Sequence, residues 1–308
     1  MTKQYAVFIV VAGNYDKVTV PAVIDSRFDY ILFSDTIKEE KVGCWQVRPI
    51  PYETDKQWLK GRYPRFNPEK LLPEYKGWLY IDGNVHILSS AVYDRCIELA
   101  ESGLEWASVN HQGRTGLFQE INAIVGLGWV HDYEVLDWYR YMKRDGYNSD
   151  NGIFEDNVIF RLNCENVHQV DKYLWWAMEK YEVRRDQFIL MWAIWKVPGL
   201  KRGYFLPENE NAWHNSGWFE CVAHNPHKRV LDQTLWEKMR NRYVQMFYAS
   251  GDWEIYYTQW FDKLIKWPFP HWAMHLWTTY MMLRYDMGFL MKRMWSRITG
   301  ITNKNNKE

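Results

Sequence analysis

The chain of 308 residues has few cysteines and no excess of charge. Its four cysteines are scattered and form no Cys-x-x-Cys pair, which argues against a structural zinc site and favours reduced thiols in a cytoplasm-like compartment. The 38 basic residues equal the 38 acidic residues, so the composition does not favour a nucleic-acid binder. Any anionic ligand must therefore be held by a local group of side chains.

The sequence also lacks a segment at its start that is typical of membrane insertion. The first apolar run, Tyr5 to Ala12, is too short to span a bilayer and is not followed by a signal-peptide cleavage pattern. The chain contains no repeat and no low-complexity tract. We therefore expect a cytoplasmic protein that is soluble or peripheral to the inner face of a membrane, with one large domain and a helical appendage.

Apolar runs alternate with amphipathic stretches over the first two thirds of the chain. Runs without alternation, such as Tyr5 to Ala12 and Phe28 to Asp35, are typical of strands buried on both faces of a parallel sheet. Further strands are expected at 44–47, before Asp82, at 105–111 and at 153–162. Helices are expected at 89–102, from 117, at 133–145, at 166–181 and at 186–196. This order predicts an α/β domain over residues 1–227.

From about residue 228 the alternation stops, and three helices are predicted at 231–249, 253–267 and 271–298. Six basic residues face a single acid, Asp286, between positions 263 and 297, among several tryptophans. Two interpretations stay open for 228–308: residues 263–298 lie on an anionic membrane surface, or the helices form a cap whose basic residues face water.

Polar side chains follow the expected strands where each strand ends. Asn14 and Asp16 come after the first strand and Asp35 ends the second. Because ligands collect at the carboxyl ends of strands in open α/β sheets, these residues are candidates for binding a base and a ribose. They are equally well explained as loop caps. Three basic residues precede the next strand and form a candidate phosphate grip: Arg62, Arg65 and Lys70.

The segment GWLYIDGNVHIL, from Gly77 to Leu88, places oxygen ligands at the end of an apolar strand. If the backbone stays extended, the side chains of Asp82 and Asn84 share one side, and Gly83 allows a ligand to approach closely. Such oxygen donors suit Mg²⁺ or Mn²⁺ bridging a diphosphate. Asp-Gly-Asn is also an ordinary turn, and its spacing alone favours the turn.

Several segments together resemble the hexosyltransferase-like family long known only as a domain of unknown function. They are ILFSD at 31–35, RYPRFNPEKLLPEYKGWLYIDGNVHIL at 62–88, Asn110-His111 with Glu120, GIFEDNVIFR at 152–161 and RRDQFILMWAIWK at 184–196. The layout is also similar to that of glycogenin-like transferases, with Lys70 and Asp82 in the places of a basic residue and a D-x-D acid.

The resemblance implies a GT-A-type sandwich with a divalent metal at the D-x-D position. Asn84 departs from the strict D-x-D form, and an amide is a poorer metal ligand than a carboxylate. A third metal ligand is expected from a late histidine, either His214 or His224. The resemblance also implies a nucleotide-sugar donor, expected to be UDP-linked, and a glycan acceptor.

Roles for the remaining candidates follow from their places in the chain. Asn110, His111 and Glu120 are expected to face the donor or acceptor sugar, although a lone histidine is more often structural. Glu155 and Asp156 are candidates for the base that activates the acceptor hydroxyl. The resemblance places Asp186 and Gln187 near the anomeric carbon, whereas a helix cap also explains Asp186.

Three functions are open from the sequence. The first is a metal-dependent glycosyltransferase (hexosyltransferase) acting in polysaccharide biosynthesis. The second is a GT-A scaffold that binds sugar or nucleotide without turnover, as Asn84 suggests. The third is a nucleotidyltransferase, but the glycine-rich, basic pyrophosphate loop typical of that class is missing between Ala12 and Thr19.

Overall fold

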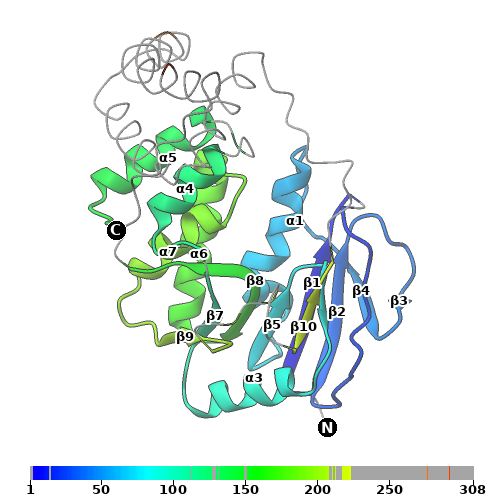
Figure 1. The fold of residues 1–308 in the computed structure, drawn as a ribbon. Coiled ribbons are helices and arrows are strands. Elements are labelled where there is room, and N and C mark those ends of the chain that lie inside the picture. Colours follow the sequence, from blue (N-terminus) through cyan, green and yellow to red (C-terminus); the bar gives the residue numbers. More distant parts are fainter. Residues whose placement is uncertain are drawn as a thin grey trace. The chain divides into compact units, whose positions relative to one another are not determined.

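A computed structural model describes residues 3–13, 15–111, 113–126, 130, 132–148, 151–207, 210, 212, 217–222, 276 and 291. Its centre is an eight-stranded sheet in the order β3-β4-β2-β1-β5-β8-β7-β9 (Figure 1). The strands are β1 (Tyr5–Val11), β2 (Phe28–Ser34), β3 (Lys41–Val42), β4 (Trp45–Pro49), β5 (Gly77–Ile81), β7 (Trp106–Asn110), β8 (Phe154–Leu162) and β9 (Arg202–Tyr204).

The sheet is mixed and mostly parallel. The strands β4, β2, β1 and β5 run parallel to one another, and β9 is parallel to β7. β8 is antiparallel to both β5 and β7, so the amino end of β8 lies beside the carboxyl end of β5. A small second sheet pairs β6 (Val85–Ile87) with β10 (Phe219–Cys221).

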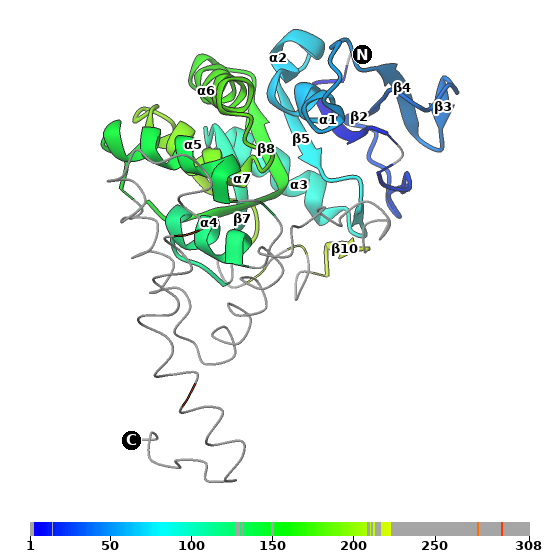
Figure 2. The same ribbon diagram turned by 90° about the horizontal axis from the view of Figure 1, so that it is seen from above.

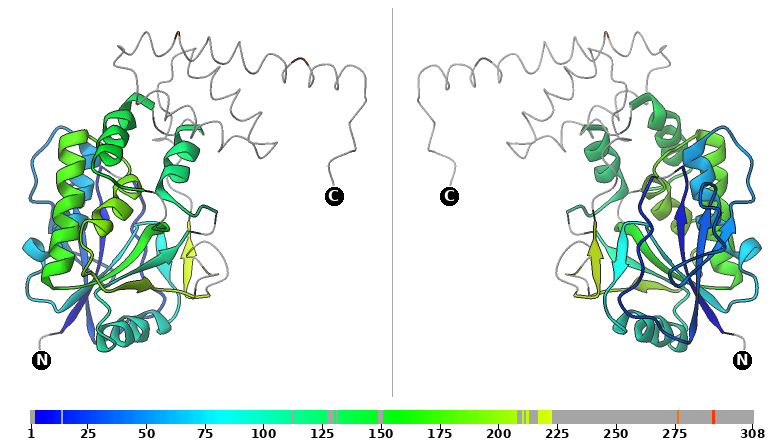
Figure 3. Two further views of the ribbon diagram at one scale, coloured as in Figure 1. Left: turned by 90° about the vertical axis from the view of Figure 1, so that its left-hand side faces the viewer. Right: turned by 90° about the vertical axis from the view of Figure 1, so that its right-hand side faces the viewer.

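Helices cover both faces of the large sheet. They are α1 (Gln57–Phe66), α2 (Pro68–Leu71), α3 (Ala91–Glu101), α4 (Leu117–Gly126), α5 (Asp132–Arg144), α6 (Glu165–Tyr181) and α7 (Gln187–Trp195). Figures 2 and 3 show α1 and α6 on one side of the sheet and α3 on the other. The helices α5 and α7 pack against α6, α4 packs against α7, and α7 contacts β8.

The alternation of side chains along β1 explains these two layers. Val7 and Ile9 point to the face covered by α3 and share a buried cluster with Tyr93. Phe8 points to the opposite face, where its ring packs 5.3 Å from that of Tyr80. Because both faces are covered, the strands are apolar without alternation, as expected for a buried sheet.

The expected fold class, a mixed α/β domain with a mostly parallel sheet, is confirmed. The segment before β5 contains the helix Gln57–Phe66, with Pro64 inside it. The stretch from Gly77 to Leu88 forms β5, a turn and β6.

The predicted C-terminal extension, 228–308, lies outside the described residues apart from the helical Leu276 and Met291. The domain boundary at 227 and the membrane-surface interpretation of 263–298 therefore stay predictions. Among the residues that the structure describes, the helices are too short or too polar to cross a bilayer.

Candidate functional site

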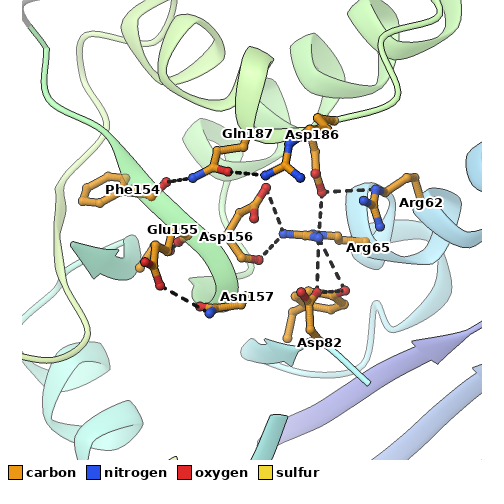
Figure 4. A network of polar contacts seen from close by, with 12 residues as sticks. Arg62, Arg65, Asp82, Phe154, Glu155, Asp156, Asn157, Asp186 and Gln187 are labelled. Atoms are coloured by element: carbon orange, nitrogen blue, oxygen red, sulfur yellow. Dashed lines mark hydrogen bonds and ion pairs between the residues drawn. The ribbon is translucent and has the colours of Figure 1, made fainter. Parts of the chain in front are cut away.

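The buried guanidinium of Arg65 joins three carboxylates from three different elements (Figure 4). It lies 2.6 Å from Asp186, which directly precedes α7, and 3.4 Å from Asp82, which follows β5. It also lies 3.4 Å from the carboxylate of Asp156 on β8 and donates to the main-chain carbonyl of Asp156. We call Arg65, Arg62, Asp82, Asp156 and Asp186 the Arg65 cluster.

The exposure of these acids differs. The side chain of Asp186 is 5% exposed, whereas those of Asp156 and Asp82 are 17% and 26% exposed. Arg62 makes a second ion pair with Asp186, at 3.3 Å. The inner carboxylate is therefore paired with two guanidiniums, and the two outer carboxylates are the more accessible to a ligand.

Arg65 is held from behind by a buried ion pair. Arg161 on β8 donates to the carbonyl of Arg65 at 2.8 Å and pairs with Asp171 of α6 at 2.6 Å. Both side chains of this pair are completely buried. The guanidinium of Arg65 also lies 4.3 Å from the ring centroid of Tyr80, which contributes a cation–π contact. The last turn of α1 is thus fixed to the sheet below it.

Asp82, Gly83 and Asn84 form the turn between β5 and β6, closed by the Val85 amide donating to the Asp82 carbonyl at 2.9 Å. Of the two interpretations of this tripeptide, the structure has the turn and not an extended backbone. Asp82 Oδ1 accepts from the Tyr80 hydroxyl at 2.6 Å. The Asn84 amide is buried and donates to the carbonyl of Val222 at 2.8 Å, which ties the turn to the segment after β10.

A bulge in β8 determines where Glu155 and Asp156 point. Ser108 of β7 is opposite Ile159, but the next residue, Val109, is opposite Glu155. Three residues of β8, from 156 to 158, therefore have no partners on β7. On its other edge β8 stays paired with β5 through Val158, and the Asp82 amide donates to the carbonyl of Asn157. Bulges re-aim side chains, and they are common beside active sites.

The acids of this region differ in pKa for identifiable reasons. Burial and the neighbouring carboxylate of Asp186 raise the pKa of Asp156, against the pull of Arg65. Burial opposes ionisation of Asp186, but the guanidiniums of Arg62 and Arg65 outweigh it and lower its pKa. Burial also raises the pKa of Glu155 to about 7. Two carboxyl groups that exchange protons near neutral pH therefore lie beside one that stays ionised.

A second cluster surrounds Glu120, which is 1% exposed in α4. Arg114 and Arg185 lie 2.7 and 3.4 Å from its two oxygens. His111 lies 3.6 Å away, and burial lowers the pKa of its imidazole. Glu120, Arg114 and Arg185 together carry a formal charge of +1 when His111 is neutral. We call these four residues the Glu120 cluster.

Gln187 connects the Glu120 cluster to the start of β8. Its carbonyl accepts from Arg185 at 2.9 Å, and its amide donates to the carbonyl of Phe154 at 3.3 Å, as Figure 4 shows. Arg114 and Arg185 are not among the site residues predicted from the sequence. Their positions in the chain gave a signal, because Arg114 follows His111 by three residues and Arg185 precedes Asp186.

The structure brings together some of the predicted strand-end residues but not all. Gly83 lies against Asp16, because a Cβ at Gly83 would stand 3.2 Å from Asp16 Oδ2. Asp35 accepts from the Gly13 amide at 2.9 Å and from Gln57 at 2.6 Å, as a loop cap does. Asn110 ends β7 opposite Phe154. Asn14 lies outside the described residues.

The predicted phosphate grip is corrected in two respects. Lys70 is exposed on α2 and donates to Asn67 at 2.6 Å. The chain after it contacts the amino end of β5, since Trp78 donates to the carbonyl of Leu72, whereas Asp82 follows the carboxyl end of β5. Arg62 and Arg65 are present at the site, but their guanidiniums neutralise Asp186. Sequence order alone does not show at which end of a strand a preceding residue lies.

Within the described ranges, no group of three or more His, Cys, Asp or Glu side chains is placed to hold a metal ion. Asp82 supplies a partly exposed carboxylate and Asn84 an amide, which fit a divalent cation only in part. Both expected histidine ligands, His214 and His224, fall outside the described residues. Val222, which the Asn84 side chain contacts, precedes His224 by two positions. Metal binding thus stays a proposal.

No family of known sequences and no curated protein matches the chain, so the resemblance to the hexosyltransferase-like family has no support from these comparisons. Among solved structures, the galactosyltransferase LgtC, in complex with donor and acceptor sugar analogues, is similar over 78% of this chain and 94% of its own, at 12% identity and a TM-score of 0.40.

Two other similar structures are core-mannan synthase A from Aspergillus fumigatus, in an Mn/GDP form, and mouse xyloside xylosyltransferase 1 in an apo form. The similarity to the synthase extends over 78% of this chain and 82% of the synthase chain, at 11% identity and a TM-score of 0.38. The similarity to the xylosyltransferase extends over 65% of this chain and 84% of the xylosyltransferase chain, at 9% identity and a TM-score of 0.38. The likeness concerns the fold.

Proposed function

We propose that this chain is a glycosyltransferase that moves a hexose from a nucleotide-sugar donor, expected to be UDP-linked, to a glycan or polysaccharide acceptor. The observation that carries the proposal is the convergence of Asp82, Asp156 and Asp186 on Arg65 at the carboxyl end of β5. Ligands of α/β sheets bind at such an edge. Carboxyl groups gathered next to two guanidiniums suit a reaction in which positive charge develops on a sugar ring.

The acids then divide into two roles. Asp186 stays ionised between Arg62 and Arg65, so it is suited to stabilise positive charge near the anomeric carbon. Glu155, with its pKa raised to about 7, is suited to take a proton from the acceptor hydroxyl. Asp156 is the alternative base, because its pKa is raised as well. Gln187 is suited to hold a sugar hydroxyl between the two clusters.

The donor diphosphate needs positive charge close to these acids. Arg114 and Arg185 carry one positive charge more than Glu120 neutralises, and Gln187 links Arg185 to the main chain of Phe154, the residue before Glu155 on β8. We assign the diphosphate to this side of the site, in place of Lys70. A divalent cation, Mn²⁺ or Mg²⁺, would be held by Asp82 and Asn84 with His224 or His214, and it would neutralise the leaving diphosphate.

A panel of nucleotide sugars tests the proposal. Thermal unfolding of the full chain is measured with each donor, with and without Mn²⁺, and released nucleoside diphosphate is then quantified for every donor that stabilises the protein. We expect stabilisation by UDP-linked donors in Mn²⁺ and slow release of the nucleoside diphosphate. Release of pyrophosphate would instead identify a nucleotidyltransferase.

The same measurement separates the proposal from a scaffold without turnover, which the amide of Asn84 in place of the second acid of a D-x-D pair favours. A scaffold would be stabilised by a donor or its nucleotide but would release no product over hours. Absence of both stabilisation and turnover with every donor would contradict a nucleotide-sugar site of either kind.

A further inference from the structure

A buried serine on the neighbouring strand closes the bulge of β8 through hydrogen bonds to main-chain carbonyls. Ser108 of β7 is completely buried, and its hydroxyl is 2.9 Å from the carbonyl oxygen of Val158. The same hydroxyl also lies within hydrogen-bonding distance of the carbonyl oxygen of Glu155. One proton is therefore shared between the carbonyl of Glu155, which precedes the three residues that are unpaired on this edge, and the carbonyl of Val158, which is the last of the three.

A carbonyl in a bulge has lost its partner on the neighbouring strand. A buried carbonyl without a hydrogen bond lowers the stability of the fold, so the bulge needs an additional hydrogen-bond donor where it leaves the ladder. The main-chain amide of Val109 continues the ladder opposite Glu155, and the carbonyl of Ser108 accepts from the Phe205 amide. The side-chain hydroxyl of Ser108 thus supplies the extra donor that the three additional residues require.

The bulge is fixed from the opposite side by Arg65, which donates to the carbonyl of Asp156. Ser108 and Arg65 together hold three of the four carbonyls from Glu155 to Val158, and the Asp82 amide holds the fourth, that of Asn157. The backbone that carries Glu155 and Asp156 is therefore defined at every residue.

We propose that Ser108 is a positioning residue for the proposed transfer reaction: its hydroxyl closes the β8 bulge and thereby orients Glu155 and Asp156 toward the acceptor. The role rests on the proposed function. Without the hydroxyl the two carbonyls separate, the bulge opens to alternative conformations, and the acids leave the geometry that the reaction needs.

Three variants of the full chain test this role. Ser108→Ala removes the hydroxyl, and Ser108→Thr retains it on a residue that suits a strand. Ser102→Ala is the matched control, because the Ser102 hydroxyl also donates to a main-chain carbonyl, that of Leu99 at 2.7 Å, but at the end of α3. Amide hydrogen exchange of residues 154–159 and the steady-state kinetics of donor hydrolysis are measured for each.

For Ser108→Ala we expect at least tenfold faster exchange in 154–159 and at least a tenfold lower kcat, with the donor KM changed by less than about threefold. The midpoint of its pH–rate profile should move to lower pH as Glu155 becomes more hydrated. Ser108→Thr should retain most of the activity, and Ser102→Ala should match the wild type.

Unchanged exchange at 154–159 in Ser108→Ala, or an unchanged pH midpoint despite lower activity, overturns the positioning role alone. Equal losses in Ser108→Ala and Ser102→Ala also overturn it. A wild-type protein that turns over no donor is a different result, because it removes the proposed function and the positioning role falls with it.

Discussion

The guanidinium of Arg65 lies 2.6 Å from the carboxylate of Asp186, and both side chains are almost completely shielded from solvent. Burying these charges is costly unless each remains paired, so the contact constrains both partners. It fixes the last turn of α1 to the start of α7, two elements separated by about half of the described chain. The same guanidinium reaches Asp82 and Asp156, so this contact determines the geometry of the whole Arg65 cluster.

Arg65→Lys tests how much the planar guanidinium matters. An ammonium keeps the charge but cannot donate at once to Asp186, Asp82 and the Asp156 carbonyl, so we expect a loss of about 2–3 kcal/mol in the free energy of unfolding. Urea denaturation at pH 7 measures it. Arg27→Lys is the control, because Arg27 bridges Asp25 and Asp94 at the surface and should cost less than about 1 kcal/mol.

Equal losses in the two variants would show that the buried contacts are no stronger than surface ion pairs. A larger loss in Arg65→Lys, together with lost activity, is the expected pattern. Activity lost without any loss of stability would instead assign Arg65 to the reaction only.

Arg161→Met tests the buried ion pair behind Arg65. The substitution leaves Asp171 buried without its partner and the Arg65 carbonyl without its donor, so we expect a loss of about 3–5 kcal/mol in the free energy of unfolding. Replacing both partners by apolar residues, Arg161→Met with Asp171→Leu, should recover a large part of that loss. A double variant as unstable as the single one would identify the bond to Arg65 as the dominant contribution.

The sequence predicted the sheet well because its buried strands carry strong apolar runs. It did not predict the Arg65 cluster as a cluster. Arg65 was expected to bind phosphate because it lies in a basic segment before a strand, and nothing local reveals that it is buried against Asp186. That pairing depends on how α1 and α7 meet over the sheet, which is a tertiary relationship.

The bulge of β8 could not be predicted from the sequence of β8 alone either. IFEDNVIFRL has the composition of an ordinary strand, and the three residues without partners on β7 become apparent only when β8 is aligned with β7 on one edge and with β5 on the other. The ambiguity of Asp82-Gly83-Asn84 was of another kind. The turn was the simpler interpretation of that tripeptide, and the structure has the turn.

Glu155→Gln tests the pH dependence of the reaction. The pKa of Glu155 is raised from 4.5 to about 7 by burial, so the carboxylate needed for a base forms only as the pH rises through about 7. We expect the wild-type kcat to increase between pH 6 and pH 8, and Glu155→Gln to lose at least tenfold activity together with this increase. A pH profile that is the same in both proteins would reject Glu155 as the base and leave Asp156.

The same substitution has a predicted effect on stability. Because the folded pKa is raised, the folded state retains a proton that the unfolded state releases between pH 4.5 and about 7. The contribution of Glu155 to stability is therefore fully present below pH 4.5 and is lost as the pH rises through 7. Relative to Glu155→Gln, the wild type should be more stable at pH 5 than at pH 8, as measured by urea denaturation of both proteins. Other buried acids, such as Asp171, titrate in both proteins and cancel in the difference.

Asp82→Asn tests the acid on which the proposed function depends most. The amide has nearly the same shape and still accepts from the Tyr80 hydroxyl, while the Arg65 cluster loses one of three acids that face two guanidiniums. We therefore expect the free energy of unfolding to change by less than about 1 kcal/mol.

Donor hydrolysis in Mn²⁺ should nevertheless fall at least 100-fold in Asp82→Asn, because the carboxylate that would hold the cation is lost. A nucleotide should still stabilise Asp82→Asn without Mn²⁺. Adding Mn²⁺ should no longer increase that stabilisation. Asp94→Asn, at an exposed ion pair with Arg27, is the control and should leave all three measurements unchanged. Hydrolysis by Asp82→Asn at the wild-type rate would exclude Asp82 from the reaction. If a nucleotide stabilises the wild type to the same extent with and without Mn²⁺, the result would exclude the bound cation but not the nucleotide site.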